Sequence, residues 1–188
     1  MRVSREQAAQ NRERIVETAA RLFREKGFDG IGVADLMKSA GLTHGGFYGH
    51  FESKEALLAE ACGKAMQGSV ERWRRIVSED PQRPVAALAR AYLTMKHRDN
   101  PGRGCAVASL GPDVSRVGPE VRQAVTDGTM AQIALLADAL PSGTPAERRA
   151  QAITSYAAMI GALILARAAD EPATATEILD TVAATISR

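Results

Sequence analysis

Three histidines and two cysteines are the side chains of this sequence that could ligate a metal ion or act as nucleophiles. His44, His50 and His97 do not share a spacing typical of a zinc site, and Cys62 and Cys105 lie far apart. No glycine-rich phosphate loop and no supported nucleophile–base pair accompanies them. We therefore expect no metal, no cofactor and no enzymatic activity, and we expect reduced thiols.

Cys105 is the candidate for thiol chemistry. It follows Gly102-Arg103-Gly104, and we predict that it lies at the start of a short helix. A helix N-terminus and a nearby cation both lower the pKa of a thiol. Cys105 is therefore a candidate sensor, with the alternative that it is a small buried apolar residue. Cys62 lies inside a predicted helix, and we expect it to be a packing residue.

The composition limits the class of protein before any motif is considered. The chain has 188 residues, of which 45% are hydrophobic and 4% aromatic, with a net charge of +2. This excludes a disordered chain and a uniformly basic nucleic-acid coat. The longest apolar stretch, 156–166, is far shorter than the roughly 20 residues of a membrane span, and the first 30 residues lack the apolar region of a secretory signal. We expect a cytoplasmic protein without a membrane partner.

The charge is unevenly distributed along the chain. Residues 1–54 carry nine basic and seven acidic side chains (9 − 7 = +2), and residues 61–100 carry eight and four (8 − 4 = +4). The remainder from 101 carries seven and nine (7 − 9 = −2). Arg2, Arg5 and Arg12 are candidate phosphate contacts, or simply a solvated helix face.

Hydrophobic periodicity and capping signals predict an all-α fold of about nine helices and no strand. Ser4 with Gln7, Thr144 with Glu147, and Thr174 with Glu177 have the spacing of capping boxes. The expected helices span about 5–26, 33–40, a brief segment after Thr43, 54–78, 84–98, a short run at 105–110, 119–140, 145–169 and 174–186.

The second and third helices have the pattern of a helix-turn-helix. Gly41 can adopt the left-handed backbone that a tight turn requires, and Leu42 supplies an apolar residue directly after it. Phe47 and Phe51 are expected to be core wedges beneath the motif. Small and polar residues lead the third helix, as entry into a DNA major groove requires.

About a quarter of the chain resembles the DNA-binding head of the tetracycline-repressor (TetR) family of bacterial regulators. The resemblance implies a helix-turn-helix domain at 1–53, an effector-binding and dimerisation domain at 54–188, and a bacterial, nucleoid-associated homodimer on palindromic operator DNA. The matching residues are Ile15, Ala19, Leu22-Phe23, Gly27-Phe28, Val33-Ala34-Asp35-Leu36, Ala40-Gly41-Leu42-Thr43, Gly46-Phe47-Tyr48-Gly49-His50-Phe51 and Ser53-Lys54-Glu55-Ala56-Leu57.

The resemblance also implies roles in DNA binding. One set would face base edges or the groove wall and a second set would hold phosphates, although packing is the alternative for Tyr48 and for His50. Gly32 stands where the family often has a capping Ser or Thr, which removes one phosphate contact. The first set is Thr43, His44, Gly45 and Gly49; the second is Gly46, Tyr48, His50 and Lys54.

The second half of the chain is expected to contain an effector pocket and a dimer interface, with plain core as the alternative for both. Some members of the family sense oxidants or electrophiles through a cysteine, which supports Cys105 as a sensor. The pocket candidates are Trp73, Ile76, Tyr92, Met95, Leu110, Val121 and Met130. The interface candidates are Ala157, Ile160, Leu163, Ile164, Ala168, Leu179, Val182 and Ile186.

These features favour a repressor that a small molecule or a reactive electrophile releases from its operator. An effector would favour one spacing of the two heads and DNA the other. The alternatives are a DNA-binding activator or architectural protein without an effector, and a helical ligand carrier or enzyme with a vestigial head.

Overall fold

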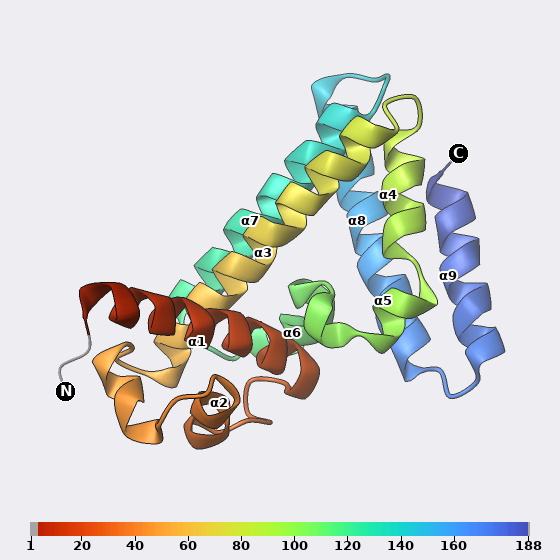
Figure 1. The fold of residues 1–188 in the computed structure, drawn as a ribbon. Helices are drawn as coiled ribbons and strands as arrows, with labels where there is room; N and C mark the ends of the chain where they lie inside the picture. The colour runs from red at the N-terminus through yellow and green to blue at the C-terminus, as the bar shows by residue number, and fades with distance from the viewer. Residues whose placement is uncertain (1–3, 188) are drawn as a thin grey trace.

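The computed structural model describes residues 4–187, and within them the chain forms nine α-helices, two short 3₁₀ helices and no strand. Figure 1 shows the head at one end, a long pair of helices rising from it, and a second group of helices beside that pair. The elements are α1 (Arg5–Lys26), α2 (Val33–Ser39), η1 (His44–Gly49), α3 (Lys54–Glu79), α4 (Pro84–Tyr92), α5 (Met95–Asp99), η2 (Pro101–Arg103), α6 (Ala106–Val114), α7 (Pro119–Ala139), α8 (Pro145–Ala168) and α9 (Pro172–Ile186).

Most helix boundaries follow the local signals in the sequence. Gly41 (φ +70°) takes the expected left-handed conformation after α2, and Gly27 (φ +78°) also has a positive φ after α1. The Thr144–Glu147 capping box is complete. At Ser4 only half of the box forms, because the hydroxyl accepts the Gln7 N–H and no reciprocal bond is made.

Three expected boundaries were wrong. The 84–98 segment breaks at 93–94, where the Thr94 hydroxyl accepts the His97 N–H and starts α5. The last helix starts at Pro172, which needs no N–H in a first turn, so no Thr174–Glu177 box forms. The short run at 105 continues as α6 through Pro112 to Val114.

The apolar core has two parts. The first joins α1, α2, η1 and the start of α3, and it continues into α6 and α7 through Leu110, Val114, Val121 and Val125. The second surrounds Trp73 and lies between α3, α4, α8 and α9. The head is therefore not an isolated core ending at residue 53, because α6 and α7 pack against it.

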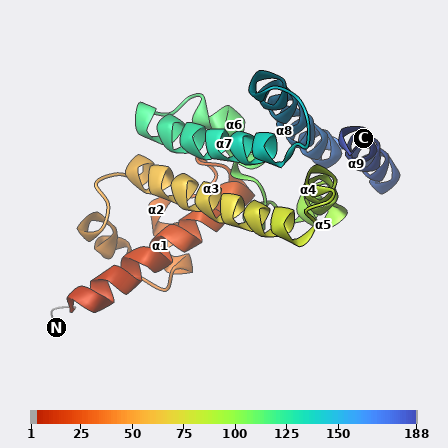
Figure 2. The same cartoon turned by 90° about the horizontal axis from the view of Figure 1, so that it is seen from above.

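The body is arranged around two helix pairs. Seen from above, α3 and α7 run along each other, and α8 and α9 form a second pair to one side (Figure 2). Among the described residues, α8 alone is long and apolar enough to meet the length and composition of a membrane span. A core helix passes the same test, and in this fold Ala152, Met159 and Leu163 of α8 are buried.

Candidate DNA-binding head and effector pocket

The segment expected to read DNA is η1, a 3₁₀ helix of six residues, which is about two turns, rather than an α-helix. Most of its candidates are exposed, and His50 is half-buried at its end. Thr43 occupies the N-cap position but its hydroxyl makes no capping bond, and the Gly46 N–H is already donated to the Thr43 carbonyl at 3.1 Å. The exposed candidates are Thr43, His44, Gly45, Gly46, Tyr48 and Gly49.

Two buried phenylalanines hold this segment in place, as the sequence predicted. Phe47 is fully buried and Phe51 nearly so, with ring centroids 5.7 Å apart. Tyr48 packs only the edge of its ring against Phe47 and remains 68% exposed. Simple packing therefore does not account for Tyr48, which projects from a rigid aromatic base.

Lys54 is separated from the other candidates. Its ammonium donates to the Phe28 carbonyl and lies 4.3 Å from the centre of the Phe28 ring. Lys54 therefore links the loop after α1 to the start of α3. In this geometry its ammonium is directed at a protein carbonyl rather than toward a phosphate.

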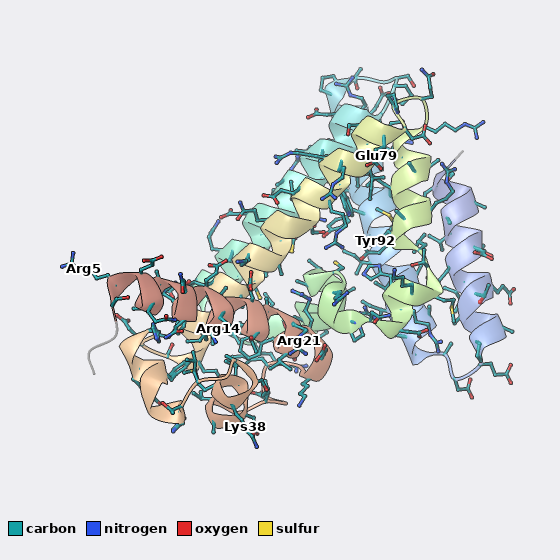
Figure 3. The ribbon with its side chains drawn as sticks, viewed as in Figure 1. Arg5, Arg14, Arg21, Lys38, Glu79 and Tyr92 are labelled. Atoms are coloured by element: carbon teal, nitrogen blue, oxygen red, sulfur yellow. The ribbon has the colours of Figure 1, made fainter. Side chains whose placement is uncertain are left out.

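The candidate phosphate-binding arginines of α1 also differ in whether a contact within the protein already engages them. The guanidinium of Arg12 pairs with Glu60 of α3 and lies over the Phe51 ring, and the hydrogen bond to Glu60 raises the pKa of Arg12. Arg5 projects from the free end of α1 (Figure 3). Arg2 lies outside the described residues.

A cavity of about 450 Å³ opens between α3, α4 and the segment from α5 to the start of α6. Trp73, Ile76 and Tyr92 line it, as the sequence predicted. Tyr92 lies where α4 faces the long α3 helix (Figure 3). The other lining residues are Ser69, Arg72, Leu88, Ala91, Thr94, Lys96, His97, Asn100, Arg103 and Cys105.

Four predicted pocket residues do not line this cavity. Leu110 and Val121 are buried in the head core, because α6 packs against α1 and α7 packs along α3. Met130 is 40% exposed on α7. Met95 is half-buried between Thr94 and Lys96, and the break before α5 turns its neighbours rather than Met95 toward the cavity. An uninterrupted helix over 84–98 would not have indicated this.

His97 is fixed as a neutral ring in the pocket wall. Its Nε2 accepts the Cys105 backbone N–H at 2.9 Å, so Nδ1 carries the proton and donates it to the Tyr92 carbonyl at 2.7 Å. Burial lowers the pKa of His97, and Arg167 and Arg72 lower it further. His97 therefore joins the end of α4 to the start of α6.

Cys105 occupies the N-cap position of α6, at the predicted start of a short helix. Cys105 is buried, with 4% of its surface exposed, and it belongs to the lining of the cavity. Cys62 is buried against α1, and burial raises its pKa to about 11. The two thiols thus have different surroundings, although neither is on the outer surface.

The wall of the pocket touches the head directly. The guanidinium of Arg24, near the end of α1, donates to the Gly102 carbonyl, with Nε at 3.1 Å. Gly102 lies between the pocket residues Asn100 and Arg103. A Cβ on Gly102 would lie 2.7 Å from the Glu25 Cγ, so a larger residue there would have to displace the Glu25 side chain. A second link joins the Phe28 N–H to Asp113 at 3.3 Å.

The predicted interface residues on α8 and α9 fall into two groups. Leu163 and Leu179 are buried inside the protomer, so their assignment to an interface was wrong: they point toward the body core. Ala157, Ile164 and Ala168 are exposed, and Ile160, Val182 and Ile186 are half-buried. The sequence analysis missed Ile153 and Leu165, which are 44% and 59% exposed on α8.

The comparisons with known proteins agree with this architecture. Residues 15–61 match the model of the family described as bacterial regulatory proteins, tetR family. The HTH-type transcriptional repressor NemR of Escherichia coli K12 is 26% identical over 166 residues, covering 83% of each chain. The crystal structure of reduced E. coli NemR superimposes with a TM-score of 0.79 over 94% of this chain and 96% of that one.

Another match is more local. The uncharacterized HTH-type transcriptional regulator YerO of Bacillus subtilis is 31% identical over 90 residues, which span 48% of this chain but only 31% of YerO. YerO is therefore a longer chain, and only part of it aligns with this one.

An all-helical body carrying an exposed helix-turn-helix on a rigid base defines a DNA-binding transcriptional regulator. Residues 15–61 match the DNA-binding segment of the TetR family of bacterial regulators, and over nearly its whole length the chain has the fold of solved regulators of that family.

Proposed function

We propose that the chain is a homodimeric repressor that binds a palindromic operator through its two heads and is released by an effector bound in the body cavity. The effector is a small molecule or a reactive electrophile. The protein acts in the bacterial cytoplasm at the nucleoid and needs no cofactor or catalytic step.

The observation that carries the DNA-binding role is the display of Tyr48. A large aromatic side chain exposed to 68% and held from below by a buried Phe47 is positioned for a partner rather than for the core. Thr43, His44 and Gly45 are exposed beside it on the same short helix. Small side chains there allow close approach to DNA, and His44 and Thr43 supply the donors and acceptors for base edges.

The outer face of α8 supports dimerisation. Ile153, Ile164 and Leu165 are large apolar side chains left exposed on one long helix. A twofold partner would cover them, with half-buried Val182 and Ile186 of α9 at its edge. Twofold symmetry would place the two heads about 34–36 Å apart, one turn of DNA or slightly more, and so selects a palindrome.

The contact between Arg24 and Gly102 supports coupling between pocket and head. A ligand that moves the 100–105 wall also moves the carbonyl that anchors the end of α1. The effector then favours one spacing of the heads and DNA the other, so each weakens the binding of the other reciprocally. An electrophile would reach Cys105 through the same cavity and would act on the same wall.

The experiment is a binding titration with the DNA that flanks the gene of this protein, in low salt. We expect tight binding, a mass in solution twice that of the chain, and a loss of affinity of about tenfold in Tyr48→Ala without loss of helix content. Met130→Ala, an exposed apolar substitution on α7, is the matched control and should bind as the wild type does. Absence of binding to any flanking fragment would contradict the proposal.

A further inference from the structure

The cavity wall carries an excess of positive charge. Arg72, Lys96 and Arg103 line it, and no aspartate or glutamate does. None of the three forms an ion pair with another described residue. What distinguishes the cavity is that three such cations gather along one wall from three separate elements, with no acidic residue among the lining residues.

One side of the cavity is apolar. Trp73 is 3% exposed and Leu88 1%, and Ile76 lies one turn further along α3. The Trp73 ring packs edge-on against Tyr92, with centroids 6.1 Å apart. A cavity of this volume lies within the range of about 300–1,000 Å³ typical of small-molecule sites. It can therefore hold an apolar body with a charged end at the cationic rim.

Two polar groups near the wall distinguish this cavity from a packing defect. The Tyr92 side chain is buried and its hydroxyl has no hydrogen-bond partner among the described residues. His97 is held neutral by its two hydrogen bonds and so adds no charge that would need an acidic partner. A core void is normally lined by apolar atoms alone, whereas here one buried hydroxyl has no partner and three cationic side chains line the wall.

We propose that the effector cavity binds an organic anion, a carboxylate carried on a compact apolar body. The body packs against the apolar side of the cavity, which Trp73, Ile76 and Leu88 line, and the carboxylate lies at the rim formed by Arg72, Lys96 and Arg103. The arginines offer paired N–H donors that match the geometry of a carboxylate. This inference rests on the proposed function only in taking the cavity to be the effector site.

The test uses three probes of one shape and different charge: phenylbutanoate, phenylbutanamide and phenylbutylamine. Trp73 is the only tryptophan of the chain, so its fluorescence reports directly on the cavity of the full-length protein. We expect phenylbutanoate to bind at least tenfold more tightly than the amide, and the amine to be weakest. The preference for the acid should decline as salt is raised.

Two variants on the same helix localise the effect. Arg72→Gln should weaken phenylbutanoate about fivefold and leave the amide unchanged, because only the acid interacts with the lost charge. Arg75→Gln, one turn away on α3 and outside the cavity lining, should change neither. Both sites are exposed, so folding is retained in both variants.

Equal binding of acid and amide, tighter binding of the amine, or equal effects of the two arginine variants would overturn the inference. None of these measurements contains DNA. A chain that binds phenylbutanoate but no operator fragment would contradict the proposed function alone, whereas a chain that binds the operator and prefers the amine would contradict the anion site alone.

Discussion

The head and the body of this chain differ in how many polar groups their interiors contain and in whether those groups are hydrogen-bonded. The head core around Ile15, Phe23 and Phe47 is apolar and closed. The two buried polar side chains among the described residues, Gln132 and Ser155, both belong to the body, as does the unpartnered hydroxyl of Tyr92. The head is built to keep one geometry, whereas the body keeps polar groups around an open volume.

This difference matches the two tasks of a ligand-controlled DNA-binding protein. A base that presents Tyr48 must not deform, so its energy comes from close packing. A cavity must accept and release a ligand, so part of its wall stays incompletely paired in the free protein. The effect of a substitution should therefore depend on the region more than on the size of the side chain.

The largest effect is expected in the head. Phe47→Ala removes a fully buried ring and should lower the free energy of unfolding by about 3–5 kcal/mol. Operator binding should be lost with it, because η1 then has no base. Thermal or urea unfolding followed by circular dichroism measures the change. Tyr48→Ala is the control and should stay within about 0.5 kcal/mol of the wild type; a similar small cost for Phe47→Ala would show that the head core is not tightly packed.

An intermediate effect is expected where the two regions meet. In the wild type, saturating phenylbutanoate should weaken operator binding by roughly 5- to 150-fold, the usual range of coupling between sites. Arg24→Ala should bring this factor close to one, because the bond from α1 to the Gly102 carbonyl is lost. Fluorescence anisotropy of a labelled operator fragment, with and without the probe, measures it.

Arg21→Ala is the matched control for Arg24→Ala. Arg21 lies on the same helix and pairs only with Glu25 among the described residues, at 3.0 Å. It should retain the coupling of the wild type. Full coupling in Arg24→Ala would show that the signal passes elsewhere, for example through Asp113 and the Phe28 N–H.

The sequence predicted the head better than the body, and the reason is physical. Caps, left-handed glycines and the Phe47–Phe51 pair are local signals, and their consequences stay within a few residues. The all-α fold and most helix ranges followed from these signals together with periodicity. Lys54 was different, because its partner is the Phe28 carbonyl, a backbone group whose direction no side-chain pattern reveals.

In the body, periodicity could not separate cavity from core. Leu110, Val121 and Leu163 each belong to the apolar face of their own helix, as the periodicity predicted. Which core each of them joins depends on how α6, α7 and α8 pack against the other helices. The cationic wall was missed because Arg72, Lys96 and Arg103 come from three separate elements. The helix break before Thr94 brings Lys96 and Arg103 to the cavity. The local sign of this break in the sequence is Thr94 itself, which caps α5 by accepting the N–H of His97.

The smallest expected effect is a change in the free energy of unfolding whose sign distinguishes a paired from an unpaired hydroxyl. Tyr92→Phe removes a buried hydroxyl that has no partner, so it should leave the free energy of unfolding unchanged or raise it by up to about 1 kcal/mol. Tyr156→Phe makes the same chemical change against the same Trp73 ring, 5.6 Å away. There the hydroxyl donates to Gln132 Oε1 at 2.7 Å, so its loss should cost about 1–2 kcal/mol.

The two substitutions together test whether the hydroxyl of Tyr92 is unpaired in solution. Thermal unfolding of both variants without ligand gives the comparison, since size, burial and aromatic contact are matched and only the pairing of the hydroxyl differs. Opposite signs would mean that the body holds a satisfied polar network beside an unsatisfied wall. Equal losses would mean that Tyr92 is paired in solution, and the contrast between a closed head and an open body would then have to rest on the charges at the rim alone.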